Sequence, residues 1–483
     1  MNSQLPVAII GAGPVGLAAA AHLLERNEIP IIFEAGSEVG ANIRTWQHVR
    51  MFSPWEYTVD RATVRLLEAH GWEMPPVDVL PTGRDLLERY MLPFAALPQI
   101  KKHIQLNARV VAVSRLGIDK MKDAGRENTP FVLHVAYADG YGALIEARAV
   151  IDASGTWHKP NPIGSDGLPA VGEKRFTSHI AYGIPDVPES DRSRYADRRV
   201  MVIGSGHSAI NALLDLVQLK TDHPQTVIIW AQRGTNLRRV YGGGEDDALP
   251  ARGRLGTRIK AAVDQGIIQI VAPFRVREIG TDAHGLCVTG ETDHGLESVL
   301  VDEIITATGA RPDLEMLREL RLDLDPALES ARALGPMIDP NIHSCGTVPP
   351  HGEAELRQPE KDFYIVGMKS YGRAPTFLLA TGYEQVRSVA AALAGDWEAA
   401  RDVQLCLPET GVCSTDLAAD GVSCCGATSS QPALLSLSSI PVNGSLLQPV
   451  TTLQTVAIDC GCDDDCCAGG VRSTTCGCDS ACC

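Results

Sequence analysis

Two stretches of the chain repeat one order of hydrophobic and polar positions. In the first, residues 7–10 are apolar, residues 11–16 form a glycine-rich turn, residues 17–26 favour a helix, and residues 31–33 are apolar again. Short runs that are apolar throughout are typical of central parallel strands, which are buried on both faces. The pattern therefore predicts a complete strand–helix–strand unit at the start of the chain.

A second unit with the same order begins near residue 199. Its expected strands are residues 199–203 and 227–230, with a turn at 204–209 and a helix at 210–219 between them. The two turns lie about 190 residues apart. Two mononucleotide-binding folds in one chain predict an α/β protein with two dinucleotide sites.

Other patterned segments connect and follow these two units. Residues 107–113 and 131–135 are expected as sheet strands on either side of a polar loop, and residues 363–368 as a further buried strand. A helix is expected from about residue 376 to residue 394. Beyond residue 395 the periodicity stops. Residues 420–456 are rich in Ser, Thr, Pro, Gly and Gln, which predicts a mobile tail.

The first turn has the spacing Gly-x-Gly-x-x-Gly, and each glycine has a physical reason. Gly11 permits a tight turn, Gly13 lets a pyrophosphate approach the backbone, and Gly16 lets the helix pack closely on the strand. Pro14 stands between them, where the helix is about to begin. Glu34 ends the next strand, 18 residues after Gly16, where its carboxylate can accept hydrogen bonds from a ribose diol. The alternative is a glycine-rich turn that binds nothing, which this context disfavours.

The second turn has the spacing Gly204-x-Gly206-x-x-Ala209, with Ser208 inside it. No acid ends its second strand, and Arg233 stands there instead. A carboxylate would repel the 2′-phosphate of NADPH, whereas a guanidinium can bind it through two hydrogen bonds. We therefore expect NADPH rather than NADH, with Arg233 as a solvated surface cation the alternative. Two further arginines follow soon after, Arg238 and Arg239.

These motifs resemble those of the two-dinucleotide-binding-domain flavoproteins, and within them the flavin-containing monooxygenase-like branch. The resemblance covers about residues 5–395 in the right order, and residues 152–160 and 307–313 carry it together with the two turns. It implies an FAD-binding domain in two segments with an NADPH-binding domain inserted between them. The implied boundaries are 1–155 and 310–395 for the FAD domain, 156–309 for the NADPH domain, and 396–483 for a Cys-rich tail.

The same resemblance implies further cofactor contacts. It places Val110 near the FAD adenine, Trp46 along the isoalloxazine and Gly367 near the flavin end. Gly155 and Gly309 each follow a hydrophobic strand, at the points where the chain passes between the two nucleotide domains. It assigns no catalytic residue, because in this family the cofactor carries the chemistry and the protein positions it.

One motif of the branch is incomplete. The fingerprint Phe-x-Gly-x-x-x-His-x-x-x-aromatic would centre on His179, but Arg175 stands where glycine is expected and Tyr182 follows one residue too early. Residues 51–57 also lack the Asn that many members place near the flavin. The motifs for the two cofactors are thus intact, and the motif for oxygen chemistry is not.

Net charge and composition disfavour several classes of binding partner. The 483 residues carry a net charge of −16, which disfavours binding to nucleic acid or to an anionic membrane surface. No apolar run approaches the ~18 residues of a membrane span, and the first residues lack the basic flank of a signal peptide. We therefore expect a cytoplasmic enzyme with a small-molecule substrate, and the resemblance implies a homodimer.

Cysteine is distributed unevenly. Only Cys287 and Cys345 precede residue 406, too far apart for the closely spaced redox pair of a disulfide reductase, while twelve of the 14 cysteines follow. Thiolates at short spacing bind soft metals and metalloids. The metal-ligand candidates are Cys460, Cys462, Cys466, Cys467, Cys476, Cys478, Cys482 and Cys483.

Three functions stay open at this point. The first is a monooxygenase that uses NADPH, FAD and O2 on a soft nucleophile or a carbonyl, with a role in arsenic or mercury detoxification. The second is an NADPH-dependent reductase whose tail thiols present a metal, a metalloid or a disulfide to the flavin. The third makes the tail a module that sequesters a soft metal.

Overall fold

The computed structural model describes residues 5–236, 240–241, 250–342, 348–375 and 377–405. All of these residues belong to the first of the two units of the chain, Met1–Ala419. The second unit, Asp420–Cys483, lies outside the described residues, so the prediction of a mobile tail falls there too.

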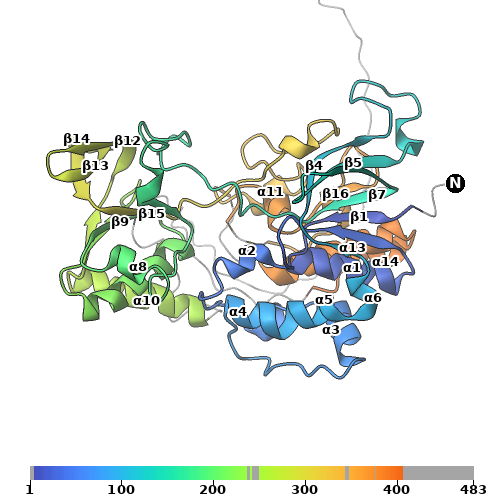
Figure 1. Ribbon diagram of the computed structural model, residues 1–483, viewed down its shortest axis with the longest axis horizontal. Coiled ribbons are helices and arrows are strands. Elements are labelled where there is room, and N and C mark those ends of the chain that lie inside the picture. Colours follow the sequence, from blue (N-terminus) through green and yellow to red (C-terminus); the bar gives the residue numbers. More distant parts are fainter. Residues whose placement is uncertain (1–4, 237–239, 242–249, 343–347, 376, 406–483) are drawn as a thin grey trace, which may run out of the picture. The chain divides into compact units, whose positions relative to one another are not determined.

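The first parallel sheet combines strands from both ends of the described chain (Figure 1). Its five strands run in the order β16-β7-β1-β2-β3, and each neighbouring pair is parallel. Every residue of β1, β7 and β16 is buried, as their apolar runs predict. The strands are β1 (Val7–Ile10), β2 (Pro30–Phe33), β3 (Ile104–Gln105), β7 (Ala149–Asp152) and β16 (Phe363–Ile365).

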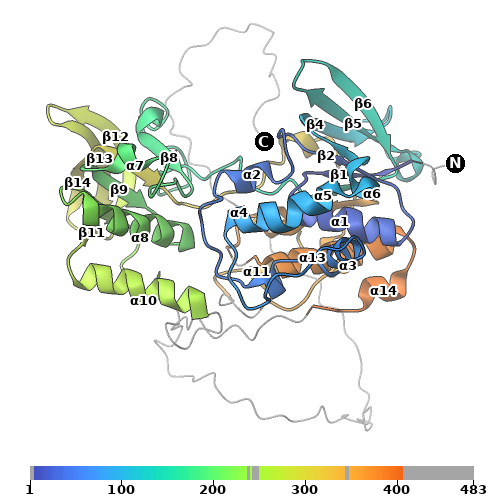
Figure 2. The ribbon, with the colours of Figure 1, turned by 60° about the horizontal axis from the view of Figure 1, so that its bottom comes forward.

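Two helices from opposite ends of this domain pack against each other. Helix α1 (Pro14–Glu25) follows β1, and helix α13 (Leu379–Leu393) follows β16. They lie side by side in Figures 1 and 2, as blue and orange ribbons. A side chain at Gly382 of α13 would lie 2.7 Å from the Val15 methyl of α1, so the close approach requires glycine there. Both helices match the sequence expectation, with α1 starting earlier because proline is favoured in a first turn.

The second parallel sheet repeats this design. Its order is β11-β10-β9-β15-β8, and again every pair is parallel. Helix α8 (His207–Asp222) connects β9 to β10, helix α10 (Pro250–Asp264) connects β10 to β11, and the two helices pack against each other. The strands are β8 (Ile180–Tyr182), β9 (Arg199–Ile203), β10 (Val227–Ala231), β11 (Ile268–Val271) and β15 (Glu303–Thr306).

Each parallel sheet is accompanied by a three-stranded antiparallel sheet. The first confirms the two strands expected near residues 107 and 131 and adds a third, in the order β4-β5-β6. The second follows β11 in the order β12-β13-β14. The strands are β4 (Ala108–Arg115), β5 (Phe131–Tyr137), β6 (Gly142–Ala147), β12 (Arg275–Asp282), β13 (Gly285–Thr292) and β14 (Gly295–Val301).

Shorter helices fill the connections. One of them, α14 (Trp397–Arg401), lies just beyond the expected domain boundary at 395, and Ser388 of α13 donates a hydrogen bond to its Ala400 carbonyl. The others are α2 (Ala41–Arg44), α3 (Arg61–Glu68), α4 (Gly83–Leu86), α5 (Leu92–Ala96), α6 (Pro98–Lys101), α7 (Arg192–Tyr195), α11 (Gly335–Ile338) and α12 (Glu353–Leu356). None of the helices in the described ranges has the length and apolar character needed to cross a membrane.

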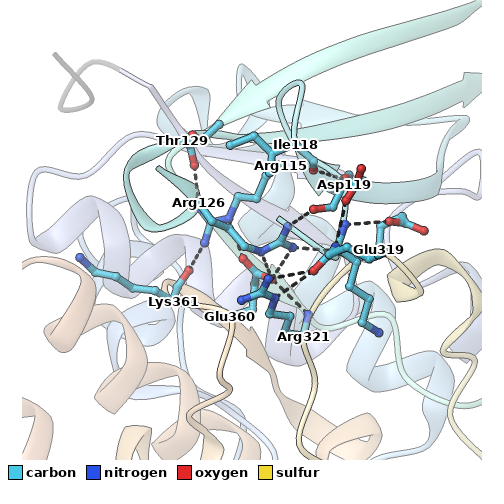
Figure 3. A network of polar contacts seen from close by, with 12 residues as sticks. Arg115, Ile118, Asp119, Arg126, Thr129, Glu319, Arg321, Glu360 and Lys361 are labelled. Carbon is cyan, nitrogen blue, oxygen red and sulfur yellow. Dashed lines mark hydrogen bonds and ion pairs between the residues drawn. The ribbon is translucent and has the colours of Figure 1, made fainter. Parts of the chain in front are cut away.

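A buried polar network joins the antiparallel sheet β4-β5-β6 to the last segment of the first domain (Figure 3). Glu360 accepts hydrogen bonds from Arg115 at 2.7 Å and from Arg126 at 2.7 Å, and also from the Arg321 backbone. The two guanidinium groups also donate four hydrogen bonds to main-chain carbonyls, among them that of Lys361. Burial alone would raise the pKa of Glu360, but the bonds from Arg126 and Arg115 hold that pKa below its ordinary value. The network therefore ties residues 115–126 to residues 319–361.

Candidate cofactor and active site

The first glycine-rich turn has the geometry that its spacing predicts. Gly11 has φ of +99°, and a Cβ there would lie 2.8 Å from the Ala153 carbonyl oxygen. A Cβ on Gly16 would lie 2.0 Å from the Gly11 oxygen, so the helix could not pack where it does. A Cβ on Gly13 would meet nothing within 4 Å, and Pro14 begins α1 directly after it. Space is thus left open at the one glycine where a pyrophosphate needs it.

Glu34 lies directly after β2, beside this turn. Its carboxylate accepts hydrogen bonds from the backbone N–H of Ala12 at 2.8 Å and of Gly36 at 2.8 Å. The side chain therefore holds the turn and presents acceptor oxygens next to the open space above Gly13. An open glycine at a helix N-terminus with a carboxylate nearby fits the pyrophosphate and ribose of FAD.

A buried ion pair lies at the same end of the sheet. Lys369 donates to Asp152 at 2.7 Å, and both side chains are completely buried. Asp152 also accepts from the Ser154 backbone at 3.0 Å and from the Ser154 hydroxyl at 2.6 Å. Ser154 adjoins Ala153, against which Gly11 packs. The ion pair therefore fixes the backbone beside the first glycine-rich turn, which we call the first cradle; the second glycine-rich turn is the second cradle. Gly155 follows with φ of +69° and open space where a Cβ would lie.

A second buried network surrounds Gly367. The Gly367 N–H donates to the Gln385 side chain at 2.7 Å, and the Gln385 amide donates to the Ser370 hydroxyl at 2.9 Å. The same amide lies 2.9 Å from Nε2 of His351, whose Nδ1 is 3.0 Å from the Pro349 carbonyl oxygen. Burial lowers the pKa of His351, which agrees with a neutral ring that accepts at Nε2. Gly367 is thus fixed in its left-handed conformation, with φ of +67°.

The second glycine-rich turn reproduces the first. Gly204 has φ of +134°, and a Cβ there would lie 2.3 Å from the Ala307 carbonyl oxygen, as Gly11 faces Ala153. A Cβ on Gly206 would meet nothing within 4 Å, so this turn also leaves room for a phosphate. Ala209 is completely buried in the core between α8 and the sheet. Ser208 lies in the first turn of α8, and Gly309, with φ of +83°, follows β15.

The residues after β10 differ from those after β2. Arg233 is exposed, and its guanidinium donates to the Ser165 carbonyl at 3.3 Å. Gln232 beside it is buried, and its amide nitrogen has no hydrogen-bond partner among the described residues. A cation at the surface and an unpaired buried donor suit a phosphorylated ribose better than an acid would. Arg238 and Arg239 lie outside the described residues.

The other expected residues occupy ordinary positions in the fold. Trp46 follows α2, and its ring packs against Gly83. Val110 is a buried residue of β4 in the core that also contains Phe33. His179 is exposed and hydrogen-bonds near the start of β15, to the Asp302 carbonyl. No hydrogen bond joins these side chains to either glycine-rich turn in the described part of the chain.

The cysteines give no redox pair where the structure can be described. Cys287 is a free thiol on β13 and the one described cysteine, since Cys345 and all later cysteines lie outside the described residues. Residues 5–405, less their gaps, contain no group of three or more His, Cys, Asp or Glu side chains that could hold a metal ion. The candidate metal ligands, Cys460 through Cys483, fall wholly in the second unit.

Two family models match segments that contain the two glycine-rich turns. Residues 125–333 match the family model of pyridine nucleotide-disulphide oxidoreductases, and residues 9–70 match that of NAD(P)-binding Rossmann-like domains. The curated monooxygenase cfoE of Aspergillus candidus is 26% identical over 234 residues, which span 47% of this chain and 35% of that protein. The chain thus matches about a third of the length of this relative.

Solved structures agree on the fold. The bacillithiol disulfide reductase Bdr (YpdA) of Bacillus cereus superposes with a TM-score of 0.61 at 20% identity, covering 81% of this chain and 99% of that one. The ornithine hydroxylase PvdA of Pseudomonas aeruginosa superposes with a TM-score of 0.54 at 15% identity, covering 81% and 99%.

The chain has two parallel sheets of Rossmann type, and each is accompanied by a glycine-rich turn and an antiparallel sheet. The chain is similar to flavin-dependent oxidoreductases of this fold, and this similarity agrees with the expected resemblance to the flavin-containing monooxygenase-like branch. The expected fold class is confirmed with it.

The glycines of the first cradle give a matched pair of variants. Gly13→Ala adds a methyl group into open space at an ordinary φ of −75°, so the apoprotein should keep its thermal midpoint. The methyl group would occupy the phosphate position, and FAD affinity should fall tenfold or more (about 1.4 kcal/mol per factor of ten). Gly16→Ala should instead destabilise the fold itself. FAD fluorescence and thermal melts measure both, and equal FAD binding by Gly13→Ala and wild type would contradict the assignment.

Removing one member of the buried ion pair should be costly. Lys369→Met leaves the Asp152 carboxylate buried without its cation, and the free energy of unfolding should fall by about 3–5 kcal/mol. Urea denaturation of the apoprotein measures this. Lys361→Met, which removes an exposed lysine of the same segment, is the control and should change little. Adding Asp152→Asn to Lys369→Met should recover part of the loss, and no recovery would argue against an unpaired charge as the cause.

Proposed function

We propose that the protein is an FAD- and NADPH-dependent monooxygenase that acts on a soft nucleophile or a carbonyl compound. The observation that carries the proposal is the pair of open phosphate cradles, at Gly13 and Gly206, in a body whose described cysteine is a lone thiol on β13. Electrons from NADPH then need an acceptor that diffuses in, and O2 is such an acceptor. The relatives named monooxygenase and hydroxylase support this choice.

The chain's own residues bind and orient in this scheme. The N-terminus of α1 and the Gly13 backbone hold the FAD pyrophosphate, Glu34 accepts from its ribose, and Gly367 lies near the flavin end. The N-terminus of α8 and Gly206 hold the NADPH pyrophosphate, with Arg233 on its 2′-phosphate. Bound FAD would supply the redox chemistry. The balance is NADPH, a proton, O2 and substrate giving NADP⁺, water and oxygenated substrate.

A reductase is the second candidate. The bacillithiol disulfide reductase among the structural neighbours favours it, and the tail holds eight cysteines in its last 24 residues. In that case the tail thiols present a metal, a metalloid or a disulfide. Soft-metal binding by the tail, a detoxification role for arsenic or mercury, a homodimer and a cytoplasmic location stay predictions from the sequence.

Oxygen dependence separates the two candidates. The full-length holoprotein should oxidise NADPH in air. Without O2 the rate of NADPH oxidation should fall at least tenfold, because no other electron acceptor is present. A variant with all eight cysteines from Cys460 to Cys483 changed to Ser is the matched control and should keep this activity. NADPH oxidation without O2 that needs Hg(II), arsenate or a disulfide, and that the eight-Ser variant loses, would establish the reductase instead. Oxidation that needs neither O2 nor the tail would contradict both.

The preference for NADPH is tested at Arg233. Arg233→Ala should raise KM for NADPH about tenfold and leave KM for NADH unchanged, because a charge-assisted hydrogen bond of about 1.5 kcal/mol is lost only with the phosphorylated ribose. Arg277→Ala removes another exposed arginine of the same domain, one paired with Glu291, and serves as the control. An equal change in both KM values would show that Arg233 does not recognise the 2′-phosphate.

A further inference from the structure

A pocket lies where α8 and α10 meet residues 48–52, next to the second glycine-rich turn. Its volume is about 320 Å³, within the range of small-molecule sites. Figures 1 and 2 show α8 and α10 lying side by side. Residues of both helices line the pocket. Phe52 and Leu255 supply apolar lining, and the Phe52 ring contacts that of His207 at 5.2 Å between centroids. The pocket thus has an apolar surface large enough for an organic molecule.

Three arginines give the pocket its charge. Arg254 and Arg258 lie one turn apart on α10, so they share a face, and both line the pocket with Arg50. All three residues are exposed overall, and Arg50 donates to the Leu80 carbonyl at 2.9 Å. Guanidinium groups favour carboxylate, sulfonate and phosphate groups because their planar donors match two acceptor oxygens. The lining therefore favours an anion.

Asp215 of α8 is the one carboxyl group of the lining. It is partly buried, and no described residue donates a hydrogen bond to it or forms an ion pair with it. Burial, assisted by the charge of Asp186, raises the pKa of Asp215 to about 7, while Arg258 opposes the shift. The other titratable or charged groups of the lining are His48, Arg50 and Arg254. Near neutral pH both forms of the Asp215 side chain are therefore populated: the carboxylate, which repels an anion, and the neutral acid, which can donate a hydrogen bond to it.

We propose that this pocket binds a small organic anion with an apolar body, whose acidic group faces Arg50, Arg254 and Arg258 and accepts a hydrogen bond from protonated Asp215. The apolar body packs against Phe52 and Leu255. Binding then requires the protonated form of Asp215, so affinity is full below the pKa of Asp215 and is lost as pH rises through it. Gly13 and Gly206 are not part of the lining, so octanoate binding can fail or succeed separately from the oxidoreductase activity proposed above.

The test uses octanoate as the probe, titrated into the full-length FAD-loaded protein by calorimetry with saturating NADP⁺ present. Both nucleotide sites are then filled, so a signal reports another site. Wild type should bind one octanoate, and its Kd should weaken about 30-fold between about pH 6 and about pH 8.5, where octanoate itself stays ionised. Binding that is absent, or that does not depend on pH, would overturn the proposal.

Three variants locate the binding. Asp215→Asn keeps a donor but cannot titrate, so octanoate should bind with nearly the same Kd at both pH values. Arg254→Ala should weaken binding tenfold or more, since a charged hydrogen bond is lost. Lys260→Ala removes another exposed cation of α10, one that pairs with Asp264, and should change nothing. Equal weakening by Arg254→Ala and Lys260→Ala would show a general charge effect, and an Asp215→Asn protein that keeps the wild-type pH dependence would contradict the role of Asp215.

Discussion

Asp152 and Lys369 are 217 positions apart in the sequence, and their charged atoms lie 2.7 Å apart at the carboxyl end of the first sheet. Both lose all contact with water, which is costly unless each charge is paired and hydrogen-bonded. Asp152 meets this condition by holding Ser154, and through it the backbone against which Gly11 packs. The first cradle therefore forms only when the two separated segments of its domain have come together.

The two domains form the glycine-rich turn with the same backbone geometry, but different side chains surround it. Gly11 faces Ala153 as Gly204 faces Ala307, because a Cβ at either glycine would strike a carbonyl oxygen of the adjacent strand's end. Thr306 occupies the position before Ala307 that Asp152 occupies before Ala153, and its buried hydroxyl has no hydrogen-bond partner among the described residues. The close approach of glycine and carbonyl backbone occurs in both domains, whereas the Asp152–Lys369 ion pair occurs in the first domain.

The sequence predicts local constraints well and distant pairings poorly. The glycine positions could be assigned because a turn, a phosphate and a helix each demand a missing side chain within six residues. The Asp152–Lys369 pair and the Gln385 network around Gly367 could not be predicted, because the local sequence of each segment does not indicate which distant residue it contacts. The strands β12 and β14 were missed for another reason. Their residues are mostly exposed, so they lack the apolar run that marks a buried strand.

The position of Cys287 bears on which acceptor takes the electrons. Nucleotides bind at the carboxyl ends of parallel strands, and both open glycines lie there. Cys287 lies instead within β13, paired in register with Gly280 and Leu300 of its antiparallel neighbours. A thiol exchanges electrons only by direct attack on its partner, so a residue held inside another sheet does not serve a flavin at the first cradle. The described residues therefore contain no thiol that is placed to exchange electrons at the first cradle, and this favours an acceptor that diffuses in for the function proposed above.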